Sequence, residues 1–145
     1  MTNYTDLAIA RHNEGFNCAQ SVLAAYAPQF GLEREMALKV AGAFGGGMGR
    51  MGETCGAVTG ALMVIGLRYG QATAEDKQAK EKSYAMAREF ADRFKARHGC
   101  LDCRDLLGCD IGTPEGMQQA REQQLFATRC AGFIRDAVEI VEQLL

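Results

Sequence analysis

Residues 57–67 read Ala57-Val58-Thr59-Gly60-Ala61-Leu62-Met63-Val64-Ile65-Gly66-Leu67, which is the most apolar stretch around which a helical core can be expected. Because it is apolar on every side, we expect a helix over about residues 55–68 that is buried among other helices. Gly56 and Gly60 lie four residues apart on one face of this helix. Glycine costs about 1 kcal/mol per helical residue relative to alanine. Close approach of a neighbouring backbone at these two glycines would compensate for that cost.

The segments on both sides of this central helix also have helical periodicity. Apolar residues recur at three- and four-residue intervals over about residues 6–30, 33–44, 73–98 and 130–145. A further helix is predicted to begin at Thr113-Pro114-Glu115, which reads as an N-cap, a proline at the first helical position and an acid in the first turn. We therefore predict an all-α fold. It would be a single domain over residues 1–145, a bundle of about five to six helices around the central helix.

Composition limits the classes of partner. The chain has 145 residues, of which 48% are hydrophobic, and a formal net charge of -2 with the two signs interspersed, so no basic face for nucleic acid is predicted. The N-terminus lacks the basic start and apolar core of a secretion signal, and no run approaches the roughly 18 apolar residues of a membrane span. We expect a cytoplasmic protein without membrane association. In that reducing compartment its six cysteines would be buried, metal-bound or redox-active rather than a permanent disulfide framework.

A glycine-rich loop places one cysteine at the start of the central helix. Gly47, Gly49 and Gly52 would allow tight turns with positive φ and bring the loop backbone close to Cys55. Thr54 could cap the helix, with Cys55 at the first helical position. The positive end of the helix dipole and its unpaired N–H groups favour a thiolate, so we predict a lowered pKa for this cysteine. Arg50 is interpreted as a solvated charge.

Three other patterns have weaker interpretations. Residues 47–52 spell G-x-G-x-x-G, but the dinucleotide-binding motif follows a strand and here a helix is predicted before it, so we interpret the run as a tight-turning connector. Cys100 and Cys103 have the spacing of redox dithiols and zinc knuckles, but no second pair at that spacing follows. Haem attachment through this pair is excluded because Arg104 stands where C-x-x-C-H requires histidine.

The remaining candidates have ordinary structural interpretations when each is taken alone. Cys18, mid-way along the first predicted helix, and Cys130, at the start of the last, are interpreted as small buried core residues. His12 and His98 have no ligand spacing to a cysteine and are expected at the surface or at helix ends.

Taken together, the cysteine segments resemble a known family over nearly the whole chain: the small redox-active proteins named for the pattern C…GCAxxG…C…C. The resemblance rests on the segments Asn17-Cys18-Ala19-Gln20, Gly45-Gly46-Gly47-Met48-Gly49-Arg50, Glu53-Thr54-Cys55-Gly56-Ala57-Val58-Thr59-Gly60, Cys103-Arg104-Asp105-Leu106-Leu107-Gly108 and Cys130. The chain reads C-G-A-x-x-G where the family name has G-C-A-x-x-G. Residue by residue, the characteristic cysteines of the family fall on Cys18, Cys55, Cys103 and Cys130. Cys100 and Cys109 are extra.

The resemblance implies that these four cysteines converge, and three functions then compete. In the first, the protein is a thiol–disulfide oxidoreductase or electron carrier, with Cys55 as the attacking thiolate and Cys18, Cys103 or Cys130 as its resolving partner. In the second, the four thiolates ligate zinc or an iron–sulfur cluster. In the third, the protein is a non-catalytic helical binding module with structural cysteines.

The sequence leaves the partners open. Under the redox interpretation the partner is a redox protein or a small molecule, with neither nucleic acid nor membrane involved. Association of two chains into a homodimer also remains open at this stage.

Overall fold

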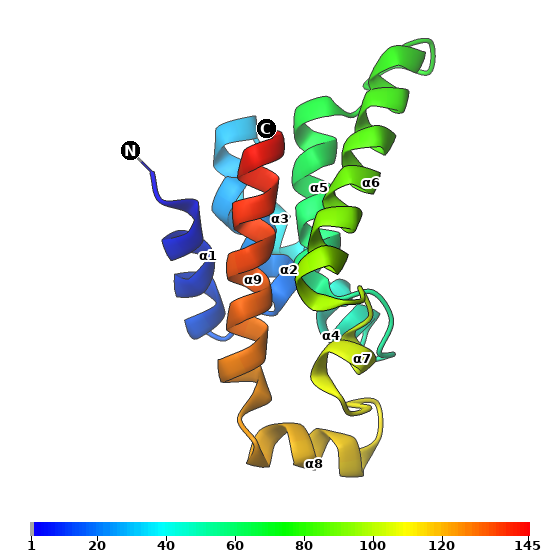
Figure 1. Ribbon diagram of the computed structural model, residues 1–145. Coiled ribbons are helices and arrows are strands. Elements are labelled where there is room, and N and C mark those ends of the chain that lie inside the picture. Colours follow the sequence, from blue (N-terminus) through cyan, green and yellow to red (C-terminus); the bar gives the residue numbers. More distant parts are fainter. Residues whose placement is uncertain (1) are drawn as a thin grey trace.

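The computed structural model describes residues 2–145, which are about three-quarters helical and contain no strand (Figure 1). The predicted all-α class is confirmed. The helical segments outnumber the predicted five to six, because one predicted helix divides and short helices form within the connecting loops. In chain order the elements are α1 (Tyr4–Asn13), α2 (Cys18–Tyr26), η1 (Ala27–Phe30), α3 (Arg34–Ala41), η2 (Gly42–Phe44), α4 (Gly45–Met48), α5 (Gly56–Tyr69), α6 (Lys77–His98), α7 (Cys103–Leu107), α8 (Pro114–Glu122) and α9 (Leu125–Leu144).

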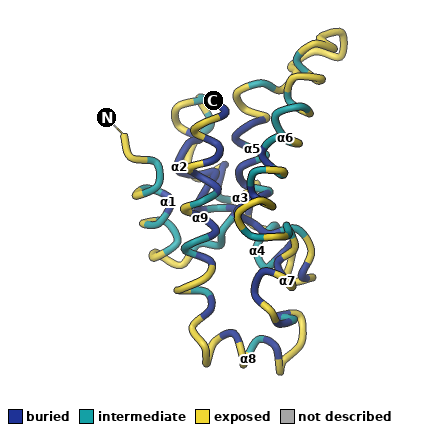
Figure 2. Tube along the Cα trace, in the orientation of Figure 1, coloured by how far each residue is buried: buried dark blue, intermediate teal, exposed yellow. Residues whose placement is uncertain are grey.

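The centre of the bundle is shared by two helices, α2 and α5. Helix α5 is the predicted central helix, and it packs against α2, α6 and α9. Its final turns are exposed at Gly66, Leu67 and Arg68, so it is enclosed only over its first part. Helix α2 is buried along most of its length and packs against α1, α3, α5 and α9, which gives both helices long buried stretches in Figure 2.

The two glycines predicted on one face of α5 do permit close packing. A Cβ atom at Gly56 would lie 2.9 Å from the backbone nitrogen of Ala19 in α2. A Cβ at Gly60 would lie 2.9 Å from the carbonyl oxygen of the same alanine. These distances are shorter than van der Waals contact, so α2 can approach α5 this closely only because both positions lack a side chain.

The first predicted helix, over residues 6–30, is wrong as a continuous element. Gly15 has a φ of 109°, which ends α1, and Asn17 then caps α2. The Asn17 side chain accepts the backbone N–H of Gln20 at 2.8 Å, and the Gln20 side chain accepts the backbone N–H of Asn17 at 3.0 Å, which forms a capping box. Cys18 is consequently the first residue of α2 rather than a mid-helix residue.

Two other helix boundaries also differ from prediction. Helix α6 starts at Lys77 instead of about residue 73, because the Asp76 side chain accepts the backbone N–H of Ala79 at 3.1 Å and caps the helix there. Helix α9 starts at Leu125, so Cys130 lies in its second turn and does not open the helix. The start of α8 is as predicted, since the Thr113 hydroxyl accepts the backbone N–H of Gly116 at 3.0 Å.

Short elements gather at one end of the bundle and build the site described below. Helices α4 and α7 are in contact, and α8 lies across this end beyond the long helices (Figure 1). No helix within residues 2–145 combines the length and apolar character needed to cross a membrane.

The close contact between α2 and α5 can be tested by replacing one glycine and comparing it with a second glycine of the same helix. We expect Gly60→Ala to lower the free energy of unfolding by about 1–3 kcal/mol, because its methyl group would overlap the Ala19 carbonyl. Gly66→Ala is the control, since nothing lies within 4 Å of its Cβ position, and it should raise stability by about 0.5–1 kcal/mol. Urea denaturation measures both changes. Equal effects of the two substitutions would contradict the packing described here.

Candidate functional site

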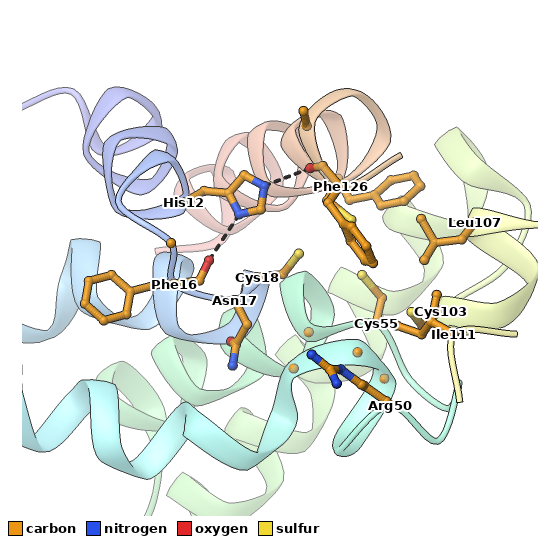
Figure 3. A pocket seen from close by; sticks show the side chains of 18 of the residues that line it. His12, Phe16, Asn17, Cys18, Arg50, Cys55, Cys103, Leu107, Ile111 and Phe126 are labelled. Carbon is orange, nitrogen blue, oxygen red and sulfur yellow. Dashed lines mark hydrogen bonds between the residues drawn. The ribbon is translucent and has the colours of Figure 1, made fainter. Parts of the chain in front are cut away.

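A cavity of about 820 Å³ opens at the end of the bundle, and the four predicted site cysteines line it. Cys18 comes from the start of α2, Cys55 from the residue before α5, Cys103 from the start of α7 and Cys130 from α9. Figure 3 shows Cys18 and Cys55 pointing toward the same space. Helix packing thus brings together cysteines that are widely separated in the sequence. Cys100 and Cys109 do not line this cavity.

The glycine-rich loop forms one wall of the cavity through an unusual backbone conformation. Residues 46–50 all have φ between 62° and 68°, which makes a short left-handed turn. Glycine adopts this conformation readily, whereas a residue with a side chain is strained in it. A Cβ atom at Gly47 would lie 2.6 Å from the Cβ of Cys103 and 2.7 Å from the backbone of Glu53. Only glycine therefore fits at position 47.

The other glycines predicted to support the site have different positions. Gly49 and Gly56 line the cavity, as Gly47 does. Gly52 lies outside it, where a Cβ would be 3.1 Å from Nε of Arg104. Gly60 is also outside the cavity and serves the contact between α2 and α5 described above.

A short antiparallel pairing fixes Cys55 next to Cys103. The backbone N–H of Cys55 donates to the carbonyl of Leu101 at 2.8 Å, and that of Cys103 donates to the carbonyl of Glu53 at 2.6 Å. Thr54 forms the bridge residue of this pairing and does not cap α5, so that prediction is wrong. Cys55 itself is the N-cap residue.

The predicted low pKa of Cys55 is also wrong. Burial raises the pKa of its thiol to about 12, because a buried thiolate loses its hydration. The backbone N–H groups of Ala57 and Val58 lower the pKa, as expected at a helix N-terminus, but they only partly offset the burial. Burial likewise raises the pKa of Cys103 to about 11. Both cysteines are therefore neutral thiols near neutral pH.

The cysteine whose pKa falls is Cys130. A hydrogen bond from the Cys18 thiol lowers the pKa of Cys130 below its ordinary value, in spite of the opposing effect of burial. The same hydrogen bond, together with burial, raises the pKa of Cys18 well above its ordinary value. Cys18 is therefore the weaker acid of the pair and Cys130 the stronger one.

His12 is a site residue that the sequence analysis missed. Its ring lies between two backbone carbonyls, 3.2 Å from Nδ1 to the oxygen of Phe16 and 2.8 Å from Nε2 to that of Phe126 (Figure 3). Phe16 precedes Cys18 by two residues and Phe126 precedes Cys130 by one helical turn. The ring thus ties together the two segments that carry the hydrogen-bonded cysteines. No spacing in the sequence relates His12 to either cysteine, so only the tertiary structure could identify it.

With the site described, comparison with known proteins identifies the family. The family model described as "Putative redox-active protein (C_GCAxxG_C_C)" matches residues 16–144. The chain belongs to this family. Neither the curated proteins nor the solved structures contain a match to the chain. The family match includes all four cysteines that line the cavity.

The four cavity cysteines of this family member are also the candidate ligands of zinc or an iron–sulfur cluster. A Cys₄ metal shell needs its sulfur atoms to converge on one point about 2.3 Å away. Within residues 2–145, no three side chains of histidine, cysteine, aspartate or glutamate are placed to bind one metal ion. The arrangement of the four sulfurs in the cavity therefore does not fit such a shell, and the thiol pair offers the better-defined chemistry.

The hydrogen bond between Cys18 and Cys130 has a measurable consequence for alkylation. Iodoacetamide reacts with thiolates, so the pH midpoint of Cys130 alkylation reports its pKa. We expect a midpoint below that of an ordinary cysteine in the wild-type protein, and an upward shift in Cys18→Ala, where burial acts without the hydrogen bond. Mass spectrometry of the peptide that contains Cys130 measures the midpoint. Cys100→Ala is the control, because Cys100 lies outside the cavity. An unchanged midpoint in Cys18→Ala would contradict the assigned donor.

Proposed function

We propose that this protein carries out thiol–disulfide exchange, with Cys130 as the attacking thiolate and Cys18 as the resolving thiol. The observation that supports this most strongly is that Cys18 and Cys130 line one open cavity, where an interaction between their side chains lowers the pKa of Cys130. A nucleophilic thiolate needs a lowered pKa, a nearby partner thiol and access for the substrate. Cys130 combines all three.

The proposed reaction begins with attack of the Cys130 thiolate on one sulfur of a substrate disulfide. The substrate S–S bond breaks, one substrate half leaves as a thiolate, and the other half remains in a mixed disulfide with Cys130. Cys18 then loses its proton and attacks the sulfur of Cys130, which releases the second substrate half. The substrate disulfide gains two electrons, and the two cysteines lose two electrons as they form a disulfide. An external dithiol would return the protein to its reduced state by the reverse exchange.

The other two cysteines have a different role in this proposal. Cys55 and Cys103 stay protonated because burial raises both pKa values, so Cys130 is the first of the cavity cysteines to ionise. Because a thiolate repels a second thiolate nearby, ionisation of one cavity cysteine raises the pKa of its neighbours. Two neutral thiols beside Cys130 avoid this repulsion. The predicted assignment of Cys55 as the attacking residue is therefore replaced by Cys130.

The partners of the reaction follow from the shape of the site. The cysteines lie within a concave cavity, which is better suited to a small disulfide than to a disulfide on a flat protein surface.

Trapping the mixed disulfide tests the proposed roles. In Cys18→Ser, incubation with hydroxyethyl disulfide should leave one hydroxyethylthio group attached to Cys130, because the resolving thiol is missing. The wild-type protein should instead release two thiols per chain and form a disulfide between Cys18 and Cys130. Intact-mass and peptide-mass spectrometry distinguish the two products.

Matched variants make this test specific. Cys130→Ser should lose at least nine-tenths of the exchange rate, whereas Cys100→Ser should keep the wild-type rate, because Cys100 does not line the cavity. Adduct formation mainly on Cys55 would overturn the assignment of the nucleophile. Stoichiometric zinc, or iron with sulfide, in protein purified anaerobically would overturn the dithiol function in favour of metal binding.

Oxidation should also stabilise the fold. A disulfide between Cys18 and Cys130 would close a loop of more than a hundred residues. Closing such a loop lowers the conformational entropy of the unfolded chain, which raises the free energy of unfolding by about 4–5 kcal/mol. For a chain of this size we expect a rise in Tm on the order of 10 °C upon oxidation. Calorimetry of the oxidised and reduced protein measures the rise, and Cys130→Ser should not show it. A Tm that is independent of oxidation in the wild-type protein would contradict this pairing.

A further inference from the structure

The cysteine cavity carries an uneven distribution of charge. Its charged lining residues are Arg50, on the glycine loop, and Arg121, on α8, while no aspartate or glutamate lines it. The protein as a whole has a formal net charge of -2, so the cavity is a positive region on a slightly acidic chain. Within residues 2–145, neither arginine forms an ion pair or a side-chain hydrogen bond. Both guanidinium groups are therefore free to bind an anion.

The two arginines and the sulfurs lie at different depths. Arg50 and Arg121 are exposed, whereas Cys55, Cys103 and Cys130 are buried. In the view of Figure 3, Arg50 and His12 lie on opposite sides of Cys18 and Cys55. A ligand that enters the cavity thus meets positive charge at the mouth and sulfur in the interior.

The rest of the cavity lining is largely apolar. Phe16, Leu107, Ile111, Met117, Phe126 and Phe133 contribute to it. A short carbon chain that joins a charged group to a sulfur atom would match this combination of charged, apolar and sulfur surfaces. The cavity volume of about 820 Å³ is within the range that binds small molecules.

The backbone at Arg50 supports a role for its side chain. Its φ is 66°, in the left-handed region, and three other residues of the same turn, Gly46, Gly47 and Gly49, are glycines. Glycine would adopt this conformation without strain, whereas a residue with a side chain is strained there. Strained residues of this kind cluster at functional sites, and Arg50 lines the cavity.

We propose that the site selects small anionic disulfides, whose carboxylate groups pair with Arg50 and Arg121 at the mouth while the disulfide sulfur reaches Cys130. This inference rests on the thiol–disulfide exchange proposed above and names its substrate class. Arginine suits the purpose because its planar guanidinium holds a carboxylate through two parallel hydrogen bonds. A neutral disulfide would enter the same cavity without these contacts, and a cationic one would be repelled.

The chemical step is the same for an anionic substrate. The Cys130 thiolate forms a bond to one substrate sulfur, the substrate S–S bond breaks, and a thiolate that carries its own carboxylate leaves. Cys18 then loses its proton and attacks Cys130, which releases the second half as its thiolate, so the substrate disulfide gains the two electrons that the two cysteines lose as they form a disulfide. The oxidised Cys18–Cys130 pair is reduced again by an external dithiol. The arginines take no part in proton or electron transfer and act by binding and steering.

A series of three short aliphatic disulfides of different charge tests this proposal. The series contains dithiodipropionate, which is anionic, hydroxyethyl disulfide, which is neutral, and cystamine, which is cationic. Each rate constant is divided by that of a free small thiol with the same disulfide, which removes differences in intrinsic reactivity. We expect the normalised rate to be about tenfold higher for the anion than for the neutral compound and lowest for the cation.

Charge-neutral variants identify the residues responsible. Arg50→Gln and Arg121→Gln should each reduce the preference for the anion by about threefold, and the double variant should abolish it. Arg88→Gln is the control, because Arg88 is an exposed arginine on α6 outside the cavity. Added salt should reduce the preference in the wild-type protein, since exposed charges are screened. A preference that survives in the double variant would overturn the proposal.

The same experiment separates failure of this inference from failure of the proposed function. If the neutral disulfide reacts rapidly with Cys130 and the anion reacts no faster, only the selection of anions is refuted. If none of the three disulfides reacts faster with the protein than with the free thiol, the thiol–disulfide function itself is refuted.

Discussion

The backbone pairing between residues 52–55 and 101–104 is the constraint on which the site depends. Two short hydrogen bonds, from Cys55 to Leu101 and from Cys103 to Glu53, join the glycine loop to the start of α7. The pairing fixes two of the four sulfurs and one wall of the cavity. Gly47 makes it possible, because any side chain there would overlap both Cys103 and the backbone of Glu53. A connection made by the backbone holds the cysteines in place without using any of their sulfur atoms.

Burial and contact with a neighbouring thiol, rather than helix position, determine the order of acidity of the cysteines. Cys55 precedes α5 and receives the expected help from backbone N–H groups, yet its pKa rises, because desolvation of a buried thiolate outweighs that help. Cys130 is also buried, but a neighbouring thiol donates to it and compensates for the lost hydration. The local environment in three dimensions thus reverses the order of acidity that the helix termini alone would give.

Much of the fold was predictable, because helix periodicity and capping are local properties. The central helix, the glycine contact with a neighbouring backbone and the Thr113 cap at α8 all follow from residues a few positions apart. The break between α1 and α2 was missed because apolar periodicity continues through Gly15. In the site, the cysteine pattern predicted which four cysteines line one cavity. It could not predict the hydrogen bond between Cys18 and Cys130 or the placement of His12, which depend on contacts across more than a hundred residues.

The left-handed turn at residues 46–50 also affects how the molecule moves. Its glycines have more conformations in the unfolded chain than other residues, so ordering this segment costs more entropy than ordering an ordinary loop. A segment that contributes little free energy to folding can open locally while the rest of the structure stays intact. Transient opening of this loop would release the pairing that holds Cys55 and Cys103 and would increase the exposure of these two buried cysteines to water. The loop is therefore the place where we expect amide hydrogen exchange near the cavity to be fastest.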